Sequence, residues 1–304
     1  MALDPYYNNV SLLLPMEGVI NQTAFIDYSP LPKAVTVYGN TKISTVQGRW
    51  GAGSGYFDGS GDYLLFPYTS ALVFGTGDFT VECWVYKTQY ASVSYDVNKD
   101  EVLFGGVGTQ TFFFYLENNS GYPRVWNGST GVGSSIAVSL GAWRHVEWSR
   151  ASGTLRIFVD GVKGYEGSYS FNHTDTTVTQ RVGGNPSGAN NRYFVGYMNG
   201  FRVTKGVARH TANFVPPERL VYASALILPG NPLRTIAGNC IVSGNGGAQA
   251  VIIREATTRL LVATATPNPI TGAWTADVPL GDYDITYFAP DCQPICHGPY
   301  TVTA

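Results

Sequence analysis

Residues 155–165 read Leu-Arg-Ile-Phe-Val-Asp-Gly-Val-Lys-Gly-Tyr. The aliphatic residues Leu155, Ile157 and Val159 fall on one face of a strand, because successive side chains of a strand point to opposite sides. Asp160-Gly161 then separates two strand-like runs. This dipeptide favours a two-residue hairpin turn, since both of its positions need a positive φ. The stretch therefore predicts an antiparallel hairpin with one face in a core.

The same pattern recurs along the chain, and no convincing helix interrupts it. Residues 80–86 alternate with period two, which places Val81, Cys83 and Val85 on one face and predicts that Cys83 is a buried hydrophobe. A second hairpin is predicted where strands 56–57 and 63–66 flank a glycine-rich turn. Further strands are expected at residues 11–14, 102–104, 111–116, 145–149 and 200–204. Many short strands joined by turns predict an all-β sandwich of antiparallel sheets.

Composition excludes several classes of protein. The 304 residues are 44% hydrophobic and only 13% charged, so the chain has ample material for a core and is not disordered. The net charge is −2 with no Lys/Arg cluster, which argues against nucleic-acid binding. No apolar run of about 18 residues exists, so no membrane insertion is expected. The N-terminus lacks the pattern of a secretory signal, so we expect a soluble chain made in a cytoplasm, or one whose leader was removed.

A domain boundary is predicted after Phe214-Val215-Pro216-Pro217, because paired prolines stop a strand and favour an extended connector. A new series of strands is expected from about residue 225 onward. We therefore predict one domain over residues 1–222 and a second over residues 223–304. The second is large enough for a small seven-stranded sandwich.

Five groups of residues in the first domain carry a family resemblance. They are residues 4–18, residues 56–64 (Tyr-Phe-Asp-Gly-Ser-Gly-Asp-Tyr-Leu), residues 74–86, residues 143–150 with 157–161, and residues 200–217. In this order they resemble the concanavalin A-like, laminin G-like domains of bacteriophage virion proteins. The resemblance implies a jelly-roll sandwich of two curved sheets. Residues 254–261 and 279–285 resemble, more loosely, immunoglobulin-like or carboxypeptidase-regulatory-like modules, which implies a smaller immunoglobulin-like β-sandwich.

A glycan site needs exposed aromatic rings that stack on sugar faces, with amides and carboxylates for the hydroxyls. The candidate residues in predicted loops are Tyr90, Tyr95, Tyr122, Trp126, Asn190, Asn191, Arg192 and Tyr193. The alternative for each aromatic residue is that it covers an end of the sandwich.

Catalytic residues are not expected. Glucanases that resemble this fold carry two glutamates on one strand face, spaced to attack and protonate a glycosidic bond. Glu82 and Glu147 instead stand alone among apolar strand residues, and we expect both on solvated strand faces. The chain is therefore predicted not to be an enzyme, with a glycoside hydrolase as an alternative.

Metal and disulfide sites are open alternatives. Asp96, Asn98 and Asp100 place oxygen-bearing side chains at alternate positions and are candidate ligands of Ca²⁺. Asp58 and Asp62 flank a glycine turn and are further candidates, although Asp and Asn are also ordinary turn formers. Cys240 is expected to form a disulfide with Cys292 or Cys296. Free thiols, or a zinc site that includes His297, are the alternatives.

The resemblance implies a non-enzymatic bacteriophage virion surface protein, a tail fibre or baseplate-associated protein that binds a host-surface glycan or receptor. The expected partners are other virion proteins and the host receptor, and the expected location is the virion. Assembly on a symmetric particle predicts a homo-oligomer. The alternative is a capsid decoration protein that clamps neighbouring virion subunits.

Overall fold

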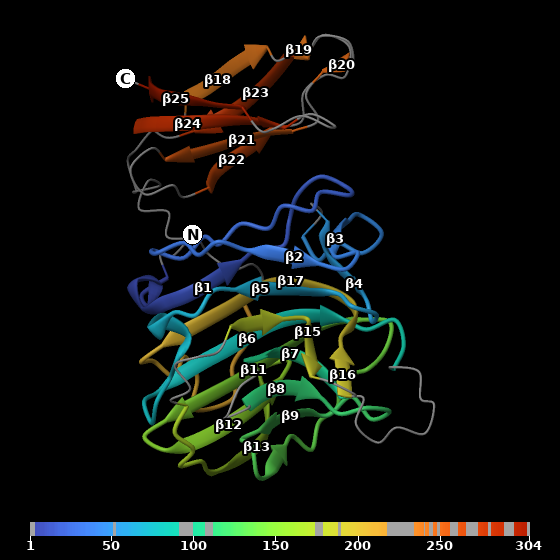
Figure 1. Cartoon of the computed structure of the whole chain (residues 1–304). Helices are drawn as coiled ribbons and strands as arrows, with labels where there is room; N and C mark the ends of the chain where they lie inside the picture. The colour runs from blue at the N-terminus through green and yellow to red at the C-terminus, as the bar shows by residue number, and fades with distance from the viewer. Residues whose placement is uncertain are drawn as a thin grey trace. The chain divides into compact units, whose positions relative to one another are not determined.

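The structure is a computed structural model in which antiparallel strands make up most of the described residues (Figure 1). It describes residues 4–50, 53–90, 100–106, 112–173, 179–187, 190–217, 234–239, 241–242, 246–247, 250–255, 261–265, 273–278, 281–288 and 295–302. Contacts divide the chain into two compact units, Asn8–Leu220 and Val221–Ala304 with Met1–Tyr7. The described helices are two short 3₁₀ turns, η1 (Tyr7–Asn9) and η2 (Ser70–Leu72). None of the described helices has the length and apolar character of a membrane span.

The larger unit contains an eight-stranded antiparallel sheet. Its strand order is β13-β12-β11-β6-β17-β4-β3, and β1 also pairs with β17. The strands are β1 (Val10–Leu14), β3 (Lys42–Ser44), β4 (Ser54–Asp58), β6 (Phe79–Tyr86), β11 (Trp143–Ala151), β12 (Thr154–Val159), β13 (Val162–Ser168) and β17 (Val195–Lys205).

A seven-stranded antiparallel sheet forms the second layer, in the order β10-β9-β8-β7-β14-β5-β2. The strands are β2 (Thr36–Tyr38), β5 (Tyr63–Phe66), β7 (Glu101–Gly106), β8 (Phe112–Leu116), β9 (Pro123–Trp126), β10 (Gly131–Gly133) and β14 (Gln180–Val182). A separate hairpin, β15 (Gly184–Ser187) with β16 (Asn190–Tyr193), follows β14. The strands predicted from the sequence fall on β1, β7, β8, β11 and β17, so the all-β sandwich is confirmed.

The hairpin at Asp160-Gly161 forms as predicted. Val159 pairs with Val162 across the turn, and the turn residues have φ values of 50° and 75°. Leu155, Ile157 and Val159 are all buried in the core.

The predicted hairpin between residues 56–57 and 63–66 is wrong. β4 belongs to the eight-stranded sheet and β5 to the seven-stranded sheet, so the turn between them carries the chain across the sandwich. The carboxylate of Asp62 holds this turn, because it accepts hydrogen bonds from the backbone N–H groups of Asp58 and Asn40. A glycine-rich turn marks a change of direction, but it does not decide whether the next strand pairs with the previous one.

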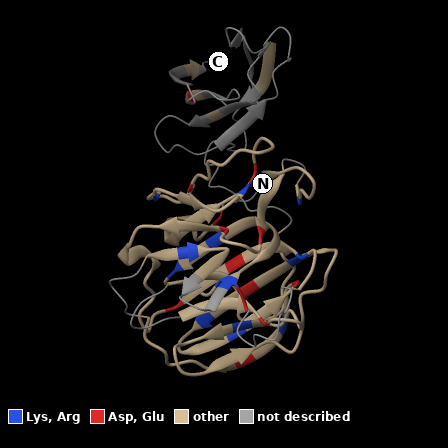
Figure 2. Ribbon diagram, turned by 45° about the vertical axis from the view of Figure 1, so that its right-hand side comes forward, with Lys and Arg blue, Asp and Glu red and all other residues tan. Residues whose placement is uncertain are grey.

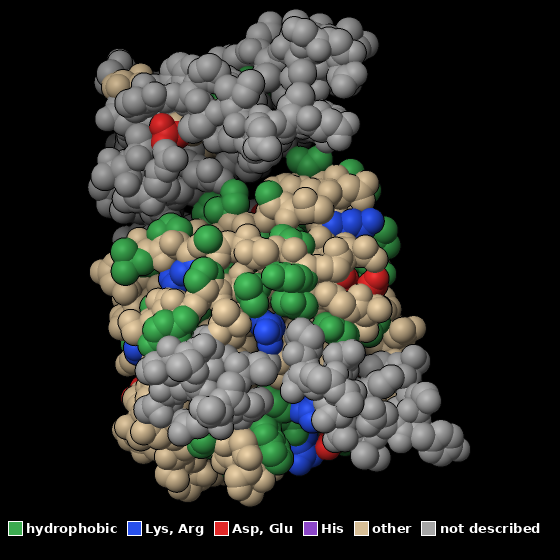
Figure 3. All heavy atoms as spheres, viewed as in Figure 1, with side chains coloured by type: hydrophobic (Ala, Val, Ile, Leu, Met, Phe, Trp, Pro, Cys, Tyr) green, Lys and Arg blue, Asp and Glu red, His purple; other side chains and the backbone are tan. Residues whose placement is uncertain are grey.

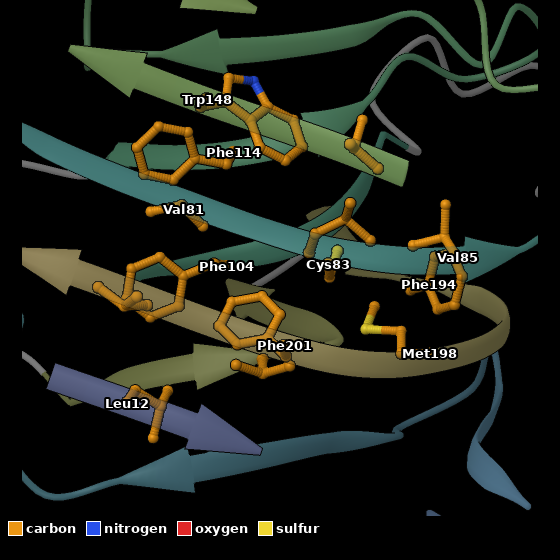
Figure 4. Packing of buried hydrophobic residues seen from close by; sticks show 14 of the residues in the cluster. Leu12, Val81, Cys83, Val85, Phe104, Phe114, Trp148, Phe194, Met198 and Phe201 are labelled. Carbon is orange, nitrogen blue, oxygen red and sulfur yellow. The ribbon is translucent and has the colours of Figure 1, made fainter. Parts of the chain in front are cut away.

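The core lies between the two sheets (Figure 4). Val81, Cys83 and Val85 project from β6, and Phe104 and Phe114 project from the opposite sheet. Cys83 is a free thiol with no exposed surface, which confirms the prediction of a buried hydrophobe. Burial raises the pKa of this thiol well above its usual range, with a smaller contribution from the charge of Glu82.

The smaller unit contains a four-stranded sheet in the order β22-β21-β24-β25 and two-stranded ladders β18-β23 and β19-β20. The strands are β18 (Arg234–Asn239), β19 (Ile241–Val242), β20 (Gly246–Gly247), β21 (Ala250–Glu255), β22 (Leu261–Ala265), β23 (Ala273–Val278), β24 (Gly281–Phe288) and β25 (Ile295–Val302). Ile253, Trp274 and Ile285 are buried in it. Its immunoglobulin-like character stays a prediction.

Candidate functional site

Three tyrosine rings follow one another on the outer face of the seven-stranded sheet. Tyr38 on β2 and Tyr63 on β5 stack with their ring centroids 4.5 Å apart and their planes 8° apart. Tyr193 on β16 stacks on Tyr63 at 6.5 Å. Tyr38 is 41% exposed, and the other two tyrosines are half-buried. The rings therefore form a short stack with one end open to solvent.

A second group of rings lies on β8 and β9 of the same sheet. Phe113 is 5.4 Å from Tyr115 and 6.5 Å from Trp126, measured between ring centroids. The guanidinium of Arg192 lies 4.6 Å above the Phe113 ring. Because Arg192 and Tyr193 are consecutive on β16, this strand contacts both groups of rings. We call the six residues Tyr38, Tyr63, Phe113, Tyr115, Trp126 and Tyr193 the aromatic platform.

Arginine side chains lie among these rings. Arg181 on β14 places its guanidinium 5.5 Å from the Tyr63 ring, and its Nη1 donates to Asn185 Oδ1 at 3.3 Å. Its buried Nε has no hydrogen-bond partner among the described residues. Figure 3 shows hydrophobic and basic side chains side by side on the face of the sandwich that it views. Arg181 therefore places a cation beside the Tyr63 ring.

The ionisable groups near Tyr115 are paired more fully. Arg124 Nη1 lies 2.7 Å from Glu117 Oε1. Burial raises the pKa of the Tyr115 hydroxyl to about 12, with a further rise from the charge of Asp100 and an opposing effect of Arg124. Tyr115 therefore stays neutral at physiological pH and keeps its hydroxyl proton.

The structure brings together three of the predicted glycan-binding residues: Trp126, Arg192 and Tyr193. Asn190 and Asn191 contribute backbone to the same strand, β16. Tyr122 lies instead in the β8–β9 turn, where its carbonyl accepts from Glu117 N, and the Tyr90 ring lies 5.5 Å from Lys87 Nζ. Tyr95 lies outside the described residues.

Sequence reasoning missed Tyr38, Tyr63, Phe113 and Tyr115. The predicted glycan-binding residues were expected in loops, whereas these four side chains lie on strands. The signal was present in the period-two alternation of residues 63–66 and 112–116, where Tyr63, Phe113 and Tyr115 occupy the positions opposite the core.

The calcium candidates are described only in part. Asp96 and Asn98 lie outside the described residues. Asp100 Oδ1 accepts from Asn118 N at 3.2 Å, and burial raises the pKa of this carboxyl. Asp58 and Asp62 both accept backbone hydrogen bonds within their turn. Within the described part of the chain, no three His, Cys, Asp or Glu side chains form a group that could hold a metal ion. Calcium binding stays a prediction.

The predicted disulfide also stays a prediction. Cys240 and Cys292 lie outside the described residues. Cys296 and His297 lie on β25, where only the backbone is described.

The prediction that Glu82 and Glu147 sit on solvated faces is wrong. They are paired residues on β6 and β11, on the outer face of the eight-stranded sheet, and neither residue has any exposed surface. Glu82 Oε1 lies 2.7 Å from Arg202 Nη2, and Glu82 Oε2 lies 3.2 Å from His145 Nε2. Glu147 Oε2 lies 2.7 Å from His210 Nδ1. Figure 2 shows acidic and basic residues on adjacent strands of the sandwich.

Residues 206–217 cover these carboxylates, and we call this segment the strap. His210 O accepts from Ser149 Oγ at 2.9 Å, and Phe214 N donates to Gly161 O at 3.0 Å. The rings of His210 and Phe214 stack at 3.5 Å with their planes 4° apart. The strap therefore crosses from β17 over β6 and β11 to the β12–β13 turn, and it seals a face that the sequence pattern alone would leave open to water.

Comparison with protein families identifies the larger unit. Residues 58–210 match the family described as the concanavalin A-like lectin/glucanases superfamily. The chain belongs to this superfamily. The matched residues include every member of the aromatic platform except Tyr38, together with Glu82 and Glu147. No curated protein matches the sequence.

Three solved structures are similar to this chain at low sequence identity. The binding domain of Paraclostridial Mosquitocidal Protein 1 has a TM-score of 0.52 at 12% identity, over 93% of this chain and 76% of that chain. Domain 4 of the arabinanase AbnA from Geobacillus stearothermophilus, solved with arabinotriose, has a TM-score of 0.47 at 16% identity, over 66% of this chain and 94% of that chain. The receptor binding domain of botulinum neurotoxin D has a TM-score of 0.46 at 11% identity, over 94% and 74%.

Proposed function

We propose that the chain is a non-enzymatic surface protein of a bacteriophage virion, and that its concanavalin A-like unit binds a host glycan, or a receptor that carries one, through the aromatic platform. The observation that carries this proposal is the convergence of the tyrosine stack with Arg181 on one sheet face. Aromatic faces with a few placed polar groups are typical of ligand sites that recognise amphipathic molecules such as sugars.

The platform offers the two kinds of group that bind a sugar, an apolar ring face and a hydrogen-bond donor. The open edge of the stack at Tyr38 offers a rigid apolar surface, and rigid aromatic residues lose little conformational entropy on binding. Arg181 is only half-buried beside the Tyr63 ring, and its guanidinium would donate to a hydroxyl or carboxylate oxygen of a ligand bound there.

The non-enzymatic assignment is supported by the state of the glutamates. A glycosidase needs its two carboxyls beside the scissile bond, with one able to donate a proton. Glu82 and Glu147 are sealed under the strap, and Glu82 is held by Arg202.

The virion assignment is supported by the ordered motif resemblance over residues 4–217, which points to a tail fibre or baseplate position. It is tested by immunogold labelling of particles with antibodies against the chain. Label at the tail tip supports the assignment. Label over the capsid favours decoration of capsid subunits instead.

The binding assignment is tested by incubating the folded chain with host cells and with an isogenic strain that lacks its surface polysaccharide. We expect saturable binding to the first strain and a large loss with the second. Equal binding to both strains, or none to any receptor-bearing strain, would contradict the proposal.

A further inference from the structure

A second row of aromatic residues lies on the outer face of the other sheet, away from the platform. Trp143, Tyr86, Tyr197 and Tyr56 occupy paired positions on the adjacent strands β11, β6, β17 and β4. Successive ring centroids are 5.7, 6.1 and 5.1 Å apart. We call these four residues the aromatic row. Cross-strand register places them side by side, because all four point away from the core.

In the described part of the chain, no hydrogen bond or ring contact of the strap reaches these four residues. The strap forms hydrogen bonds with Thr80, Ser149 and Gly161. Its His210 ring bonds to Glu147, and its Phe214 ring packs on His145. Tyr56, Tyr86 and Trp143 are half-buried, and Tyr197 is 8% exposed. No hydroxyl or indole N–H of the row bonds to another described residue, so these polar atoms remain available to a ligand.

The row ends at a cavity of about 560 Å³, which Tyr56 lines together with Asp58, Asn40 and Lys42. The remaining lining residues are Thr23, Val37, Gly39 and Thr41. Cavities of roughly 300–1,000 Å³ are the usual size of small-ligand sites. The position of Tyr56 makes the row and the cavity one continuous surface.

The polar groups of the cavity are partly used. Asp58 Oδ1 accepts from Ser60 N at 2.7 Å, and Oδ2 accepts from Asn40 Nδ2 at 3.1 Å, which leaves each oxygen a further acceptor site. Lys42 has no ion-pair partner within the described part of the chain. One carboxylate, one amide and one ammonium therefore converge beside an aromatic ring, and their formal charges cancel.

We propose that the aromatic row and this cavity form a second binding site, which takes a neutral saccharide chain. The rings contact the apolar faces of successive sugars, and Asp58, Asn40 and Lys42 exchange hydrogen bonds with hydroxyl groups of a sugar in the cavity. The charges of Asp58 and Lys42 balance each other, so the lining has no excess charge that would neutralise an ionic ligand. This balance favours a neutral ligand. The aromatic row and the platform lie on different sheets, although the cavity is lined by Val37 of β2, the strand that also carries Tyr38.

The test is titration calorimetry of the full chain with maltohexaose, cellohexaose, mannohexaose and xylohexaose. We expect at least one of these sugars to bind, and Tyr56→Ala and Trp143→Ala each to weaken that binding about tenfold, which corresponds to the loss of roughly 1.4 kcal/mol. Lys42→Ala should weaken the binding several-fold. Because it changes a surface residue, it should fold and still tests the site if an aromatic variant does not fold. Tyr68→Ala is the control, because Tyr68 is 41% exposed and lies in neither set of rings.

A platform variant, Tyr193→Ala, separates this proposal from the proposed function. Weaker binding by the row variants supports the second site, whether or not Tyr193→Ala also binds less. The second site is refuted if none of the sugars binds, or if Tyr56→Ala, Trp143→Ala and Lys42→Ala all bind like the wild type. Should Tyr193→Ala alone lose binding, the platform assignment stands without the second site.

Discussion

Glu82 and Glu147 face each other across β6 and β11, in a part of the sheet that no water reaches. Burial alone would raise the pKa of both carboxyls. At Glu82 the nearby Arg202, His145 and Arg209 outweigh burial, so the pKa of Glu82 falls well below its usual range. At Glu147 burial prevails, and the charge of Glu82 adds to it against the hydrogen bond of His210, so the pKa is raised. The pKa values of the two carboxyls therefore shift in opposite directions because their partners differ.

This asymmetry predicts unequal costs of substitution. Glu82→Gln removes the counter-charge of Arg202 inside the protein, and breaking a buried ion pair on one side costs about 3–5 kcal/mol. Glu147→Gln keeps a side chain of similar size opposite His210 and removes a carboxyl whose charged form burial disfavours, so we expect a smaller loss of about 1 kcal/mol. Urea unfolding at neutral pH measures both free energies. Equal losses, or a larger loss for Glu147→Gln, would contradict the opposite pKa shifts of the two carboxyls.

The contact between the strap and the β12–β13 turn predicts a difference between two glycines. Gly161 and Gly153 have φ values of 75° and 76°, so Ala is strained at both positions, at a cost of about 1–2 kcal/mol. A Cβ at Gly161 would also collide with the carbonyl oxygen of Phe214, whereas a Cβ at Gly153 meets nothing within 4 Å. We expect Gly161→Ala to destabilise the chain by about 2 kcal/mol more than Gly153→Ala. Thermal or urea unfolding of the pair provides the measurement, and equal losses would argue against a tightly seated strap.

His173 predicts a pH dependence of stability. Its ring centroid lies 4.3 Å from Phe112 and 4.7 Å from Phe171, and burial, with the charge of Arg150, lowers its pKa to about 3. The unfolded chain protonates this histidine near pH 6.5, so between about pH 6.5 and 3 the unfolded state binds more protons. Stability should therefore fall as the pH drops through this window, by up to about 1.4 kcal/mol per pH unit from this group.

The variant His173→Phe isolates this contribution, because it keeps a ring of similar size among the phenylalanines. We expect the free energy of unfolding of the variant to depend less steeply on pH between about pH 6 and 4 than that of the wild type. Parallel pH profiles of the two proteins would contradict the assignment of His173 as a buried neutral group.

Local sequence patterns predicted the parts of the fold that depend on neighbouring residues. Asp160-Gly161 determines its own backbone conformation, so its hairpin was predictable. The turn at residues 58–62 has equally clear local chemistry, but whether β5 pairs with β4 depends on β2 and β14, which flank β5 in its sheet. That choice is not encoded near the turn.

The candidate site shows the same limit. Alternation correctly places Glu82 and Glu147 away from the core, but their burial comes from His210 and Phe214, which lie more than 60 residues further along the chain. Trp126 and Tyr193 could be predicted as single aromatic residues. Tyr38 and Tyr63 could not, because only the register of β2 against β5 brings their rings together. Pairing between distant strands creates both the platform and the ionic cluster.

The most direct test of the platform compares Tyr38→Ala with Tyr68→Ala. Both tyrosines are 41% exposed, but only Tyr38 stacks on Tyr63. The dissociation constant for purified host surface polysaccharide should rise about tenfold for Tyr38→Ala, the equivalent of roughly 1.4 kcal/mol, and stay unchanged for Tyr68→Ala. Equal constants for Tyr38→Ala and the wild type would contradict binding at the platform.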